Sequence, residues 1–280
     1  MTKQLDQHQL ILVDAHVHIY SCFELTKFFD SASNNFRQAA ANLSNNQRYA
    51  AILLLAETSK DNYFDYLATL AQYNPKLSTD WTIKTTSESS SLIMCHSQGQ
   101  LLYLIAGRQI ITAENLEVLS LIGKRKIEDG KTLARVVRET IDAGSIPVIP
   151  WGFGKWIGTR GTILEEFLAE RGFPYLFLGD NSGRPRFWPK PRYFQLAREK
   201  GIKILPGSDP LPFTPEFCRS GSFGFAVYGT VDAQTPAQSI KQILLKSTVE
   251  PKPYGLPETP YRFIRNQIAM QIVKHQRAKK

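Results

Sequence analysis

The chain has 280 residues, of which 34 are Lys or Arg and 25 are Asp or Glu, so its formal net charge is +9. With 42% hydrophobic and 21% charged residues, its composition is that of a globular protein, which excludes disorder as the overall state. The longest apolar run, 50–56, is far shorter than the roughly 20 residues that a membrane-spanning helix needs, so we expect no membrane segment.

The N-terminal segment 1–9 is polar and shows neither a secretory signal nor a transit peptide, which predicts a cytoplasmic location. The three cysteines are far apart and form no Cys-x-x-Cys pair, so a disulfide framework or zinc ribbon is not expected. The excess positive charge is local, because segment 184–203 carries +6 and the last ten residues carry +4. This distribution favours a small anionic partner over nucleic acid, and the basic tail is interpreted as a solvated helix end.

Strand-like and helix-like segments alternate along the chain, which indicates a mostly parallel sheet with helices outside it. The predicted strands are 10–20, 49–57, 81–86, 91–96, 101–112, 116–122, 146–151, 175–180, 203–209 and 223–228. The predicted helices lie within 23–42 and at 62–72, 131–143, 162–171, 191–200 and 236–246. Segment 97–100, Ser-Gln-Gly-Gln, reads as a hairpin turn. The fold class predicted is α/β, an irregular TIM-like β/α barrel with an inserted β-hairpin.

One barrel domain is expected over residues 1–250. Residues 251–280 are predicted to be a Pro-rich connector followed by a basic C-terminal helix from 261 to about 274.

The first predicted strand carries ligand-type side chains on one of its faces. Asp14, His16 and His18 alternate with apolar residues, so they point to the same side of the strand. Burying these polar groups without partners would cost roughly 2–7 kcal/mol each. A divalent metal held by the two imidazoles would give the polar side chains of this face their partner. The alternative is a pair of core histidines hydrogen-bonded to neighbouring backbone. We assign Asp14 to holding a ring or a loop in place.

Other strands end in acidic residues, and enzymes with parallel sheets place their sites at such ends. A single strand-end Asp is more often a helix cap or turn residue, but several beside a His-x-His pair predict further metal ligands. The candidates, together with Asn181 as a residue that orients them, are Glu57, Glu117, Asp180 and Asp209.

These motifs, taken in order, resemble the PHP (polymerase and histidinol phosphatase) family of metallo-dependent hydrolases. The matching runs are Asp14-Ala15-His16-Val17-His18, Glu57-Thr58, the segment 107–112, the segment 116–119 and Gly207-Ser208-Asp209-Pro210. The resemblance covers roughly residues 10–212, and only its first and last motifs are specific. It implies a distorted seven-stranded barrel that hydrolyses phosphoesters with two or three metals held by His, Asp and Glu.

The sequence also departs from the family pattern. Gln109 stands where the family has Glu, Glu117 replaces a later His, and Asp209-Pro210-Leu211 replaces the closing Asp-x-His. With only five histidines in the chain, a His-rich three-metal site cannot be assembled. We therefore expect one ion, at most two, of Mn, Zn or Mg. His96, beside the hairpin, is interpreted as structural.

Two segments are candidates for binding an anionic substrate. The Gly-rich stretch 151–162 runs into a helix with a predicted capping box, Thr162 and Glu165, and offers Lys155 and Arg160. It reads either as an anion-binding loop or as an aromatic-packed lid. The second segment provides the guanidinium groups of Arg184 and Arg186, with a solvated basic surface as the alternative.

These observations predict a metal-dependent hydrolase that acts on an anionic small molecule, a phosphoester more readily than an amide or ester. A metal-activated water would attack, Asp209 would act as general base if it is not a ligand, and Arg184 would stabilise the developing charge. The alternatives are an amidohydrolase-type C–N or ester hydrolase, or a catalytically degenerate barrel that serves as a binding or scaffold protein. The oligomeric state is not indicated.

Overall fold

The computed structural model describes residues 9–44, 48–170 and 172–278 of the chain, with side chains up to residue 272. The basic tail at 274–280 therefore lies outside the described side chains. The strands of the described part are β1 (Gln9–Val17), β2 (Tyr49–Leu55), β3 (Trp81–Thr85), β4 (Ser91–His96), β5 (Leu101–Ile105), β6 (Gly107–Ile111), β7 (Glu117–Leu121), β8 (Ile146–Pro150), β9 (Phe177–Asn181), β10 (Lys203–Gly207), β11 (Gly224–Gly229) and β12 (Lys252–Tyr254).

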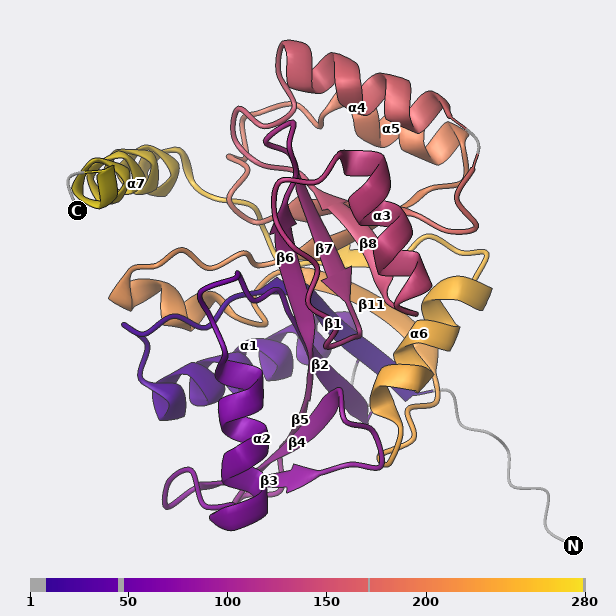
Figure 1. The fold of residues 1–280 in the computed structure, drawn as a ribbon. Helices are drawn as coiled ribbons and strands as arrows, with labels where there is room; N and C mark the ends of the chain where they lie inside the picture. The colour runs from indigo at the N-terminus through magenta and orange to yellow at the C-terminus, as the bar shows by residue number, and fades with distance from the viewer. Residues whose placement is uncertain (1–8, 45–47, 171, 279–280) are drawn as a thin grey trace, which may run out of the picture.

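Helices alternate with these strands over much of the chain (Figure 1). They are α1 (Leu25–Leu43), α2 (Tyr63–Tyr73), α3 (Leu133–Asp142), α4 (Thr159–Ala169), α5 (Arg192–Glu199), α6 (Pro236–Lys246), α7 (Pro260–Ala278) and the 3-10 helix η1 (Thr214–Arg219). Within the described residues no helix is both long and apolar enough to cross a membrane.

The strands form two mixed sheets. One has the order β12-β11-β1-β2-β5-β4-β3, and the other has the order β10-β9-β8-β7-β6. In the seven-stranded sheet β1, β2 and β5 are parallel, whereas β11 and β4 run antiparallel to their neighbours. In the five-stranded sheet β8, β9 and β10 are parallel, whereas β7 is antiparallel to both β6 and β8.

The predicted barrel is wrong, because neither sheet closes. No ladder of paired strands joins the two sheets in the described residues. They meet through the apolar layer between them, an isolated bridge between Glu57 and Arg108, and hydrogen bonds such as that from the Asp209 N–H to the His16 carbonyl at 2.8 Å. The segment expected as one strand, 101–112, divides at Ala106 into β5 and β6, which belong to different sheets. The antiparallel run β6-β7-β8 also breaks the β/α alternation that a barrel needs.

The hairpin predicted at 97–100 is confirmed. Its turn joins β4 to β5, which pair antiparallel. Gly99 adopts φ +88°, and its N–H donates to the His96 carbonyl at 2.9 Å, so the turn uses a conformation that glycine tolerates best. The expected Pro-rich connector is partly regular, because residues 252–254 form the edge strand β12.

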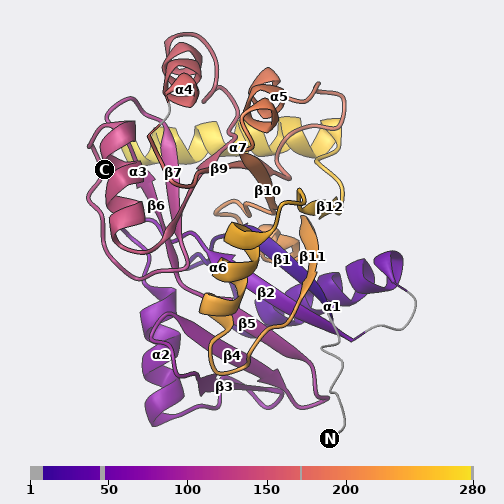
Figure 2. The same ribbon diagram turned by 90° about the vertical axis from the view of Figure 1, so that its right-hand side faces the viewer.

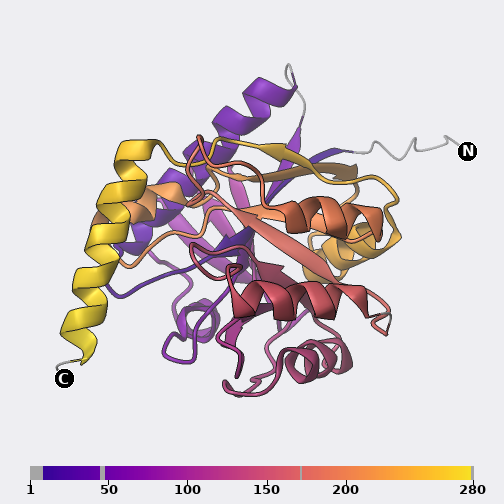
Figure 3. The same cartoon turned by 90° about the horizontal axis from the view of Figure 1, so that it is seen from above.

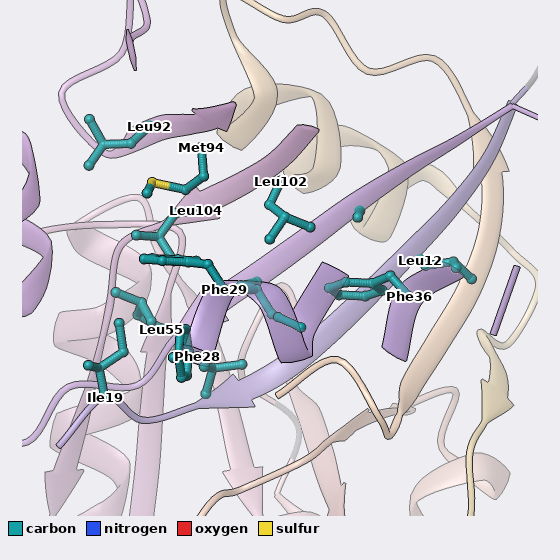
Figure 4. Close-up of a cluster of buried hydrophobic side chains, with 14 of the residues drawn as sticks. Leu12, Ile19, Phe28, Phe29, Phe36, Leu55, Leu92, Met94, Leu102 and Leu104 are labelled. Atoms are coloured by element: carbon teal, nitrogen blue, oxygen red, sulfur yellow. The ribbon is translucent and has the colours of Figure 1, made fainter. Parts of the chain in front are cut away.

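Helices cover the outer face of each sheet, and a further apolar layer lies between the sheets (Figures 1 and 2). On the seven-stranded sheet α1 buries Phe28, Phe29 and Phe36, which are fully enclosed (Figure 4). Both faces of β1 are buried, since Leu12 belongs to this cluster and Val13 to the layer between the sheets. The polar groups at the end of β1 are therefore held in a rigid frame.

Helices α3, α4 and α5 pack on the outer face of the five-stranded sheet. Helix α7 lies apart from them, along one side of the molecule (Figure 3). Its first turns are anchored by the segment before it, where the Arg186 N–H donates to the Glu258 carbonyl at 2.9 Å and the Glu258 N–H donates to the Ser182 carbonyl at 2.8 Å.

Candidate metal centre

Three side chains with metal-ligating atoms meet where β1 and β10 end. His16 and His18 come from the first strand and the residues just after it, and Asp209 follows β10. Within the described chain, these are the three residues of the His, Cys, Asp and Glu types whose ligand atoms lie within 4.8 Å of one another. The two Nε2 atoms are 3.0 Å apart, and each is 3.5 Å from Asp209 Oδ1. Both histidines are buried, whereas the Asp209 side chain is 23% exposed, so the group opens to solvent on the carboxylate side.

A local irregularity in β1 sets the directions of its polar side chains. The pairing of β1 with β2 shifts register between Asp14 and Val17, so the simple alternation expected along the whole strand does not hold. Val13 faces the layer between the sheets, but Val17 and Ile19 face the helix-covered side. Such a bulge re-aims side chains next to functional sites.

Asp14 is fully buried and holds two loops against the site. Its Oδ1 accepts the Ser208 N–H at 2.8 Å, and its Oδ2 accepts the Gly221 N–H at 2.8 Å. Burial raises the pKa of Asp14 to about 6, although the hydrogen bonds from Ser208 and Gly221 pull in the opposite direction. The carboxylate thus ties the backbone after β10 and the backbone after η1 to β1.

The backbone around Asp209 is unusual and closely packed. Asp209 has φ +47°, a left-handed conformation that costs a non-glycine residue free energy and occurs often at functional sites. Two positions before it, β10 approaches β1 so closely that a Cβ on Gly207 would lie 2.3 Å from the His16 nitrogen. Only glycine fits there, and this approach places Asp209 opposite the imidazoles.

Two amide side chains complete the surroundings of the group. Gln109 on β6 brings its Oε1 to 3.2 Å from His16 Nε2. Asn181, at the end of β9, donates from Nδ2 to Asp209 Oδ2 at 2.8 Å and to the Trp151 carbonyl at 2.7 Å. The amide of Asn181 therefore orients the carboxylate, and the oxygen of Gln109 faces the imidazoles.

The electrostatic surroundings favour the ligand forms of these groups. Burial lowers the pKa of His16, against the opposing effect of the Asp209 carboxylate, so the imidazole is neutral at neutral pH. Burial alone would raise the pKa of Asp209, but His16, His18 and Arg219 outweigh it and hold that pKa at about 2. A neutral imidazole and an ionised carboxylate are the forms that bind a divalent cation.

The other acidic candidates lie outside this group, each with a partner of its own. Glu57 accepts the Phe64 N–H at 2.8 Å, and burial raises its pKa. The other two acids form ion pairs, Glu117 with Lys155 at 3.0 Å and Asp180 with Arg184 at 2.9 Å.

The candidate substrate-binding cations are also engaged within the chain. Arg184 is buried and holds both Asp180 oxygens with a guanidinium fork. Arg186 is exposed and donates to the Pro257 carbonyl at 2.9 Å, and Arg160 donates to the Gly154 carbonyl at 2.6 Å. The predicted capping box is wrong, because α4 begins at Thr159 after a Gly158 cap that makes no side-chain hydrogen bond.

A cavity of about 180 Å³ adjoins Asp209 and contains a cation that the sequence analysis missed. Arg219, from η1, lines it and is 7% exposed. Its guanidinium contacts Glu258 and Ser182 Oγ, and its Nε lies 3.6 Å from Glu216. The positive charge of Arg219 helps to lower the pKa of Asp209. No sequence motif identifies Arg219. It reaches the site only because the chain turns after Pro210 and the 3-10 helix η1 brings the residue back.

Comparisons with known proteins find likeness in structure alone. No protein-family model matches the sequence, and the search of curated proteins finds no match. The crystal structure of PsfC from Pseudomonas syringae PB-5123 is similar over 95% of this chain and 99% of that one, at 14% identity and a TM-score of 0.57. Two endonuclease structures are similar at lower TM-scores. One is Endonuclease Q in complex with a 27-mer duplex substrate that has an abasic lesion at the active site, at 10% identity, 89% and 60% coverage and a TM-score of 0.49. The other is the lesion-specific endonuclease PfuEndoQ from Pyrococcus furiosus, at 12% identity, 87% and 57% coverage and a TM-score of 0.47.

The fold and the site together define an α/β protein of two mixed sheets with a group of side chains that could hold a metal ion. Its fold is the one that PsfC shares over nearly the full length of both chains.

Proposed function

We propose that the chain is a metal-dependent hydrolase of phosphoesters that holds one divalent cation with His16, His18 and Asp209. The observation that carries the proposal is the convergence of three buried or half-buried ligand atoms within 4.8 Å. Two imidazoles whose Nε2 atoms lie 3.0 Å apart, both beside one carboxylate, form a donor set of the kind that Zn²⁺ or Mn²⁺ takes.

The residues present fit such an ion. Two nitrogens and one carboxylate oxygen leave coordination positions for solvent or substrate, which is the pattern of catalytic sites. The Gln109 oxygen, 3.2 Å from His16 Nε2, is a neutral fourth donor. One ion fits better than two, because Asp180, Glu117 and Glu57 already have partners elsewhere in the chain.

When bound, the cation would lower the pKa of a bound water and polarise a phosphoryl oxygen. The chain itself positions the ligands. The Asn181 amide donates to Asp209 Oδ2 and leaves Oδ1 facing the imidazoles. Asp14 ties the backbone of Ser208 and Gly221 to β1, which keeps Asp209 in its left-handed conformation.

The cavity beside Asp209 supports an anionic substrate. Its lining includes Lys155 and Arg219, which pair with the lining carboxylates of Glu117, Glu216 and Glu258. The amides of Asn181 and Asn266 also line it. A buried guanidinium close to the metal ligands is well placed to stabilise negative charge on a phosphoryl group. The amides can donate hydrogen bonds to phosphoryl oxygens. These donors favour a phosphoester over a neutral amide or ester.

A hydrolysis assay with purified, metal-loaded protein tests the proposal. The substrates are bis(p-nitrophenyl) phosphate, p-nitrophenyl phosphate and p-nitrophenyl acetate, each with added Mn²⁺ or Zn²⁺. We expect turnover of at least one phosphoester that falls on the order of 10²–10⁴-fold in Asp209→Asn. His96→Ala is the matched control, because His96 lies on β4 against Trp81 and does not belong to the ligand group. This variant should keep the hydrolysis rate of the unchanged protein.

Two results would reject the proposal. Cleavage of the acetate alone would assign the site to ester chemistry. Stoichiometric metal without hydrolysis of any of the three would instead favour a binding protein.

A further inference from the structure

A second cavity, of about 500 Å³, adjoins the cavity beside Asp209, which we call the metal-side cavity. The two cavities share the residues 151–153 as lining. Its volume falls within the usual range of small-molecule sites, roughly 300–1,000 Å³, whereas the metal-side cavity of about 180 Å³ is smaller than that range. The larger part of any substrate that reaches Asp209 therefore has room in the second cavity.

Aromatic rings dominate the lining of this second cavity. They come from the loop after β8, from the segment before α5 and from the first turn of α5, and they are Trp151, Phe153, Trp156, Trp188 and Tyr193. Trp156 and Tyr193 are buried and pack edge to face with centroids 5.7 Å apart, so they form a fixed floor. A flat ligand placed on such a surface gains stacking contacts that require no particular hydrogen-bond pattern.

Phe153 stands at the boundary of the two cavities. Its ring is 47% exposed and meets Trp188 edge to face at 5.9 Å and Phe263 of α7 at 5.2 Å. Phe263 lines the metal-side cavity and Trp188 lines the second one. One ring thus connects the aromatic surface to the site of the proposed chemistry.

The charges at the second cavity suit an anion attached to the flat group. Its lining includes Lys190 and Arg192 and contains no carboxylate. Arg192 lies over the Tyr193 ring at 5.0 Å and pairs with exposed Glu165 at its edge. Lys190 is exposed and has no ion-pair partner in the described part of the chain, so its charge is available to a ligand.

We infer that this aromatic cavity binds a nucleobase, so that the phosphoester cleaved at the metal centre is that of a nucleotide. The inference rests on the proposed function and adds the substrate class. The base would stack on the edge-to-face pair of Phe153 and Trp188, and its phosphate would lie toward Asp209 and Arg219. The sequence of segment 151–162 is compatible with either an anion loop or an aromatic lid, and the proposed base site gives its aromatic residues a binding role.

Calorimetric titration of the metal-free full-length chain in EDTA tests the inference separately from catalysis. The probes are adenosine 5′-monophosphate and ribose 5-phosphate, which carry the same phosphate but differ in the base. We expect the nucleotide to bind at least tenfold more tightly, because its base gains stacking contacts that ribose 5-phosphate lacks. Equal affinities for the two probes would overturn the inference.

Variants show which residues produce the preference for adenosine 5′-monophosphate over ribose 5-phosphate. Trp188→Ala and Phe153→Ala should each reduce it to less than threefold, Trp188→Phe should retain it, and Tyr73→Ala, an 84% exposed aromatic on α2, should leave it unchanged. A circular dichroism melt confirms that each variant is folded. A preference that survives both alanine variants would refute the assignment to this cavity.

The double variant His16→Ala/His18→Ala separates this inference from the proposed function. It should keep the base preference while losing metal. Loss of the preference in that variant would contradict a base site that is independent of the metal.

Discussion

The close approach of β10 to β1 at Gly207 predicts a large effect from one added methyl group. In Gly207→Ala the new Cβ would lie 2.3 Å from the His16 nitrogen, 2.5 Å from His16 Cβ and 2.9 Å from the Ala15 carbonyl carbon. Two of these atoms are backbone of a buried strand, so the strands must separate. Overpacking of this kind costs about 1–3 kcal/mol, against roughly 0.4–1 kcal/mol gained by restricting the unfolded chain.

We expect a net loss of about 1–2 kcal/mol in the free energy of unfolding, measured by urea denaturation. Metal affinity, measured by competition with a chromophoric chelator, should fall at least tenfold, because the Asp209 N–H bonded to the His16 carbonyl moves with β10. Gly172→Ala is the matched control, since a Cβ there meets nothing within 4 Å, and it should be neutral in both assays. If Gly207→Ala behaves like Gly172→Ala, the steric argument for the position of Asp209 is refuted.

Three further results are expected. Asp14→Asn should lower the free energy of unfolding by about 1–3 kcal/mol in urea denaturation, because its amide nitrogen cannot accept the Gly221 N–H; an unchanged midpoint would contradict this. Arg184→Ala should cost about 3–5 kcal/mol by leaving the Asp180 carboxylate buried and unpaired, and Arg184→Ala/Asp180→Asn should recover part of that loss; a stable single variant with a raised KM would instead make Arg184 a substrate ligand. Metal affinity should persist to a lower pH than for an ordinary histidine near 6.5, because burial lowers the pKa of His16 and protonation competes with metal only below it; an affinity that falls already at pH 7 would contradict this.

The sequence predicted the histidine pair and its carboxylate partner because all three lie at strand ends. His16 and His18 belong to the first apolar strand, and Asp209 follows a short buried strand before a proline. Adjacent strand ends meet in space, so these residues come together whether or not the sheet closes.

The remaining acidic candidates show what strand-end reasoning omits. Asp180 also lies at the end of a buried strand, but the arginine four residues later forks onto it. Glu117 reaches Lys155 on a loop 38 residues further along the chain. Which partner an acid finds depends on loop conformation, and residue type and spacing do not encode it.

The barrel was wrong for a related reason. Alternating strands and helices are common to closed and open arrangements, and closure depends on continuous hydrogen-bonded ladders. Here β6, β7 and β8 run antiparallel, and β5 separates from β6 at Ala106. Arg219 was missed because a 3-10 helix, which has no apolar periodicity, returns it to the site.

The central claim is that His16, His18 and Asp209 hold a single divalent cation. An anomalous difference map from crystals soaked in Mn²⁺ or Zn²⁺ tests it most directly. The account predicts one strong peak within about 2.0–2.2 Å of His16 Nε2, His18 Nε2 and an Asp209 oxygen. A map with no peak there, or with its strongest peak at Glu57, Glu117 or Asp180, would contradict the account.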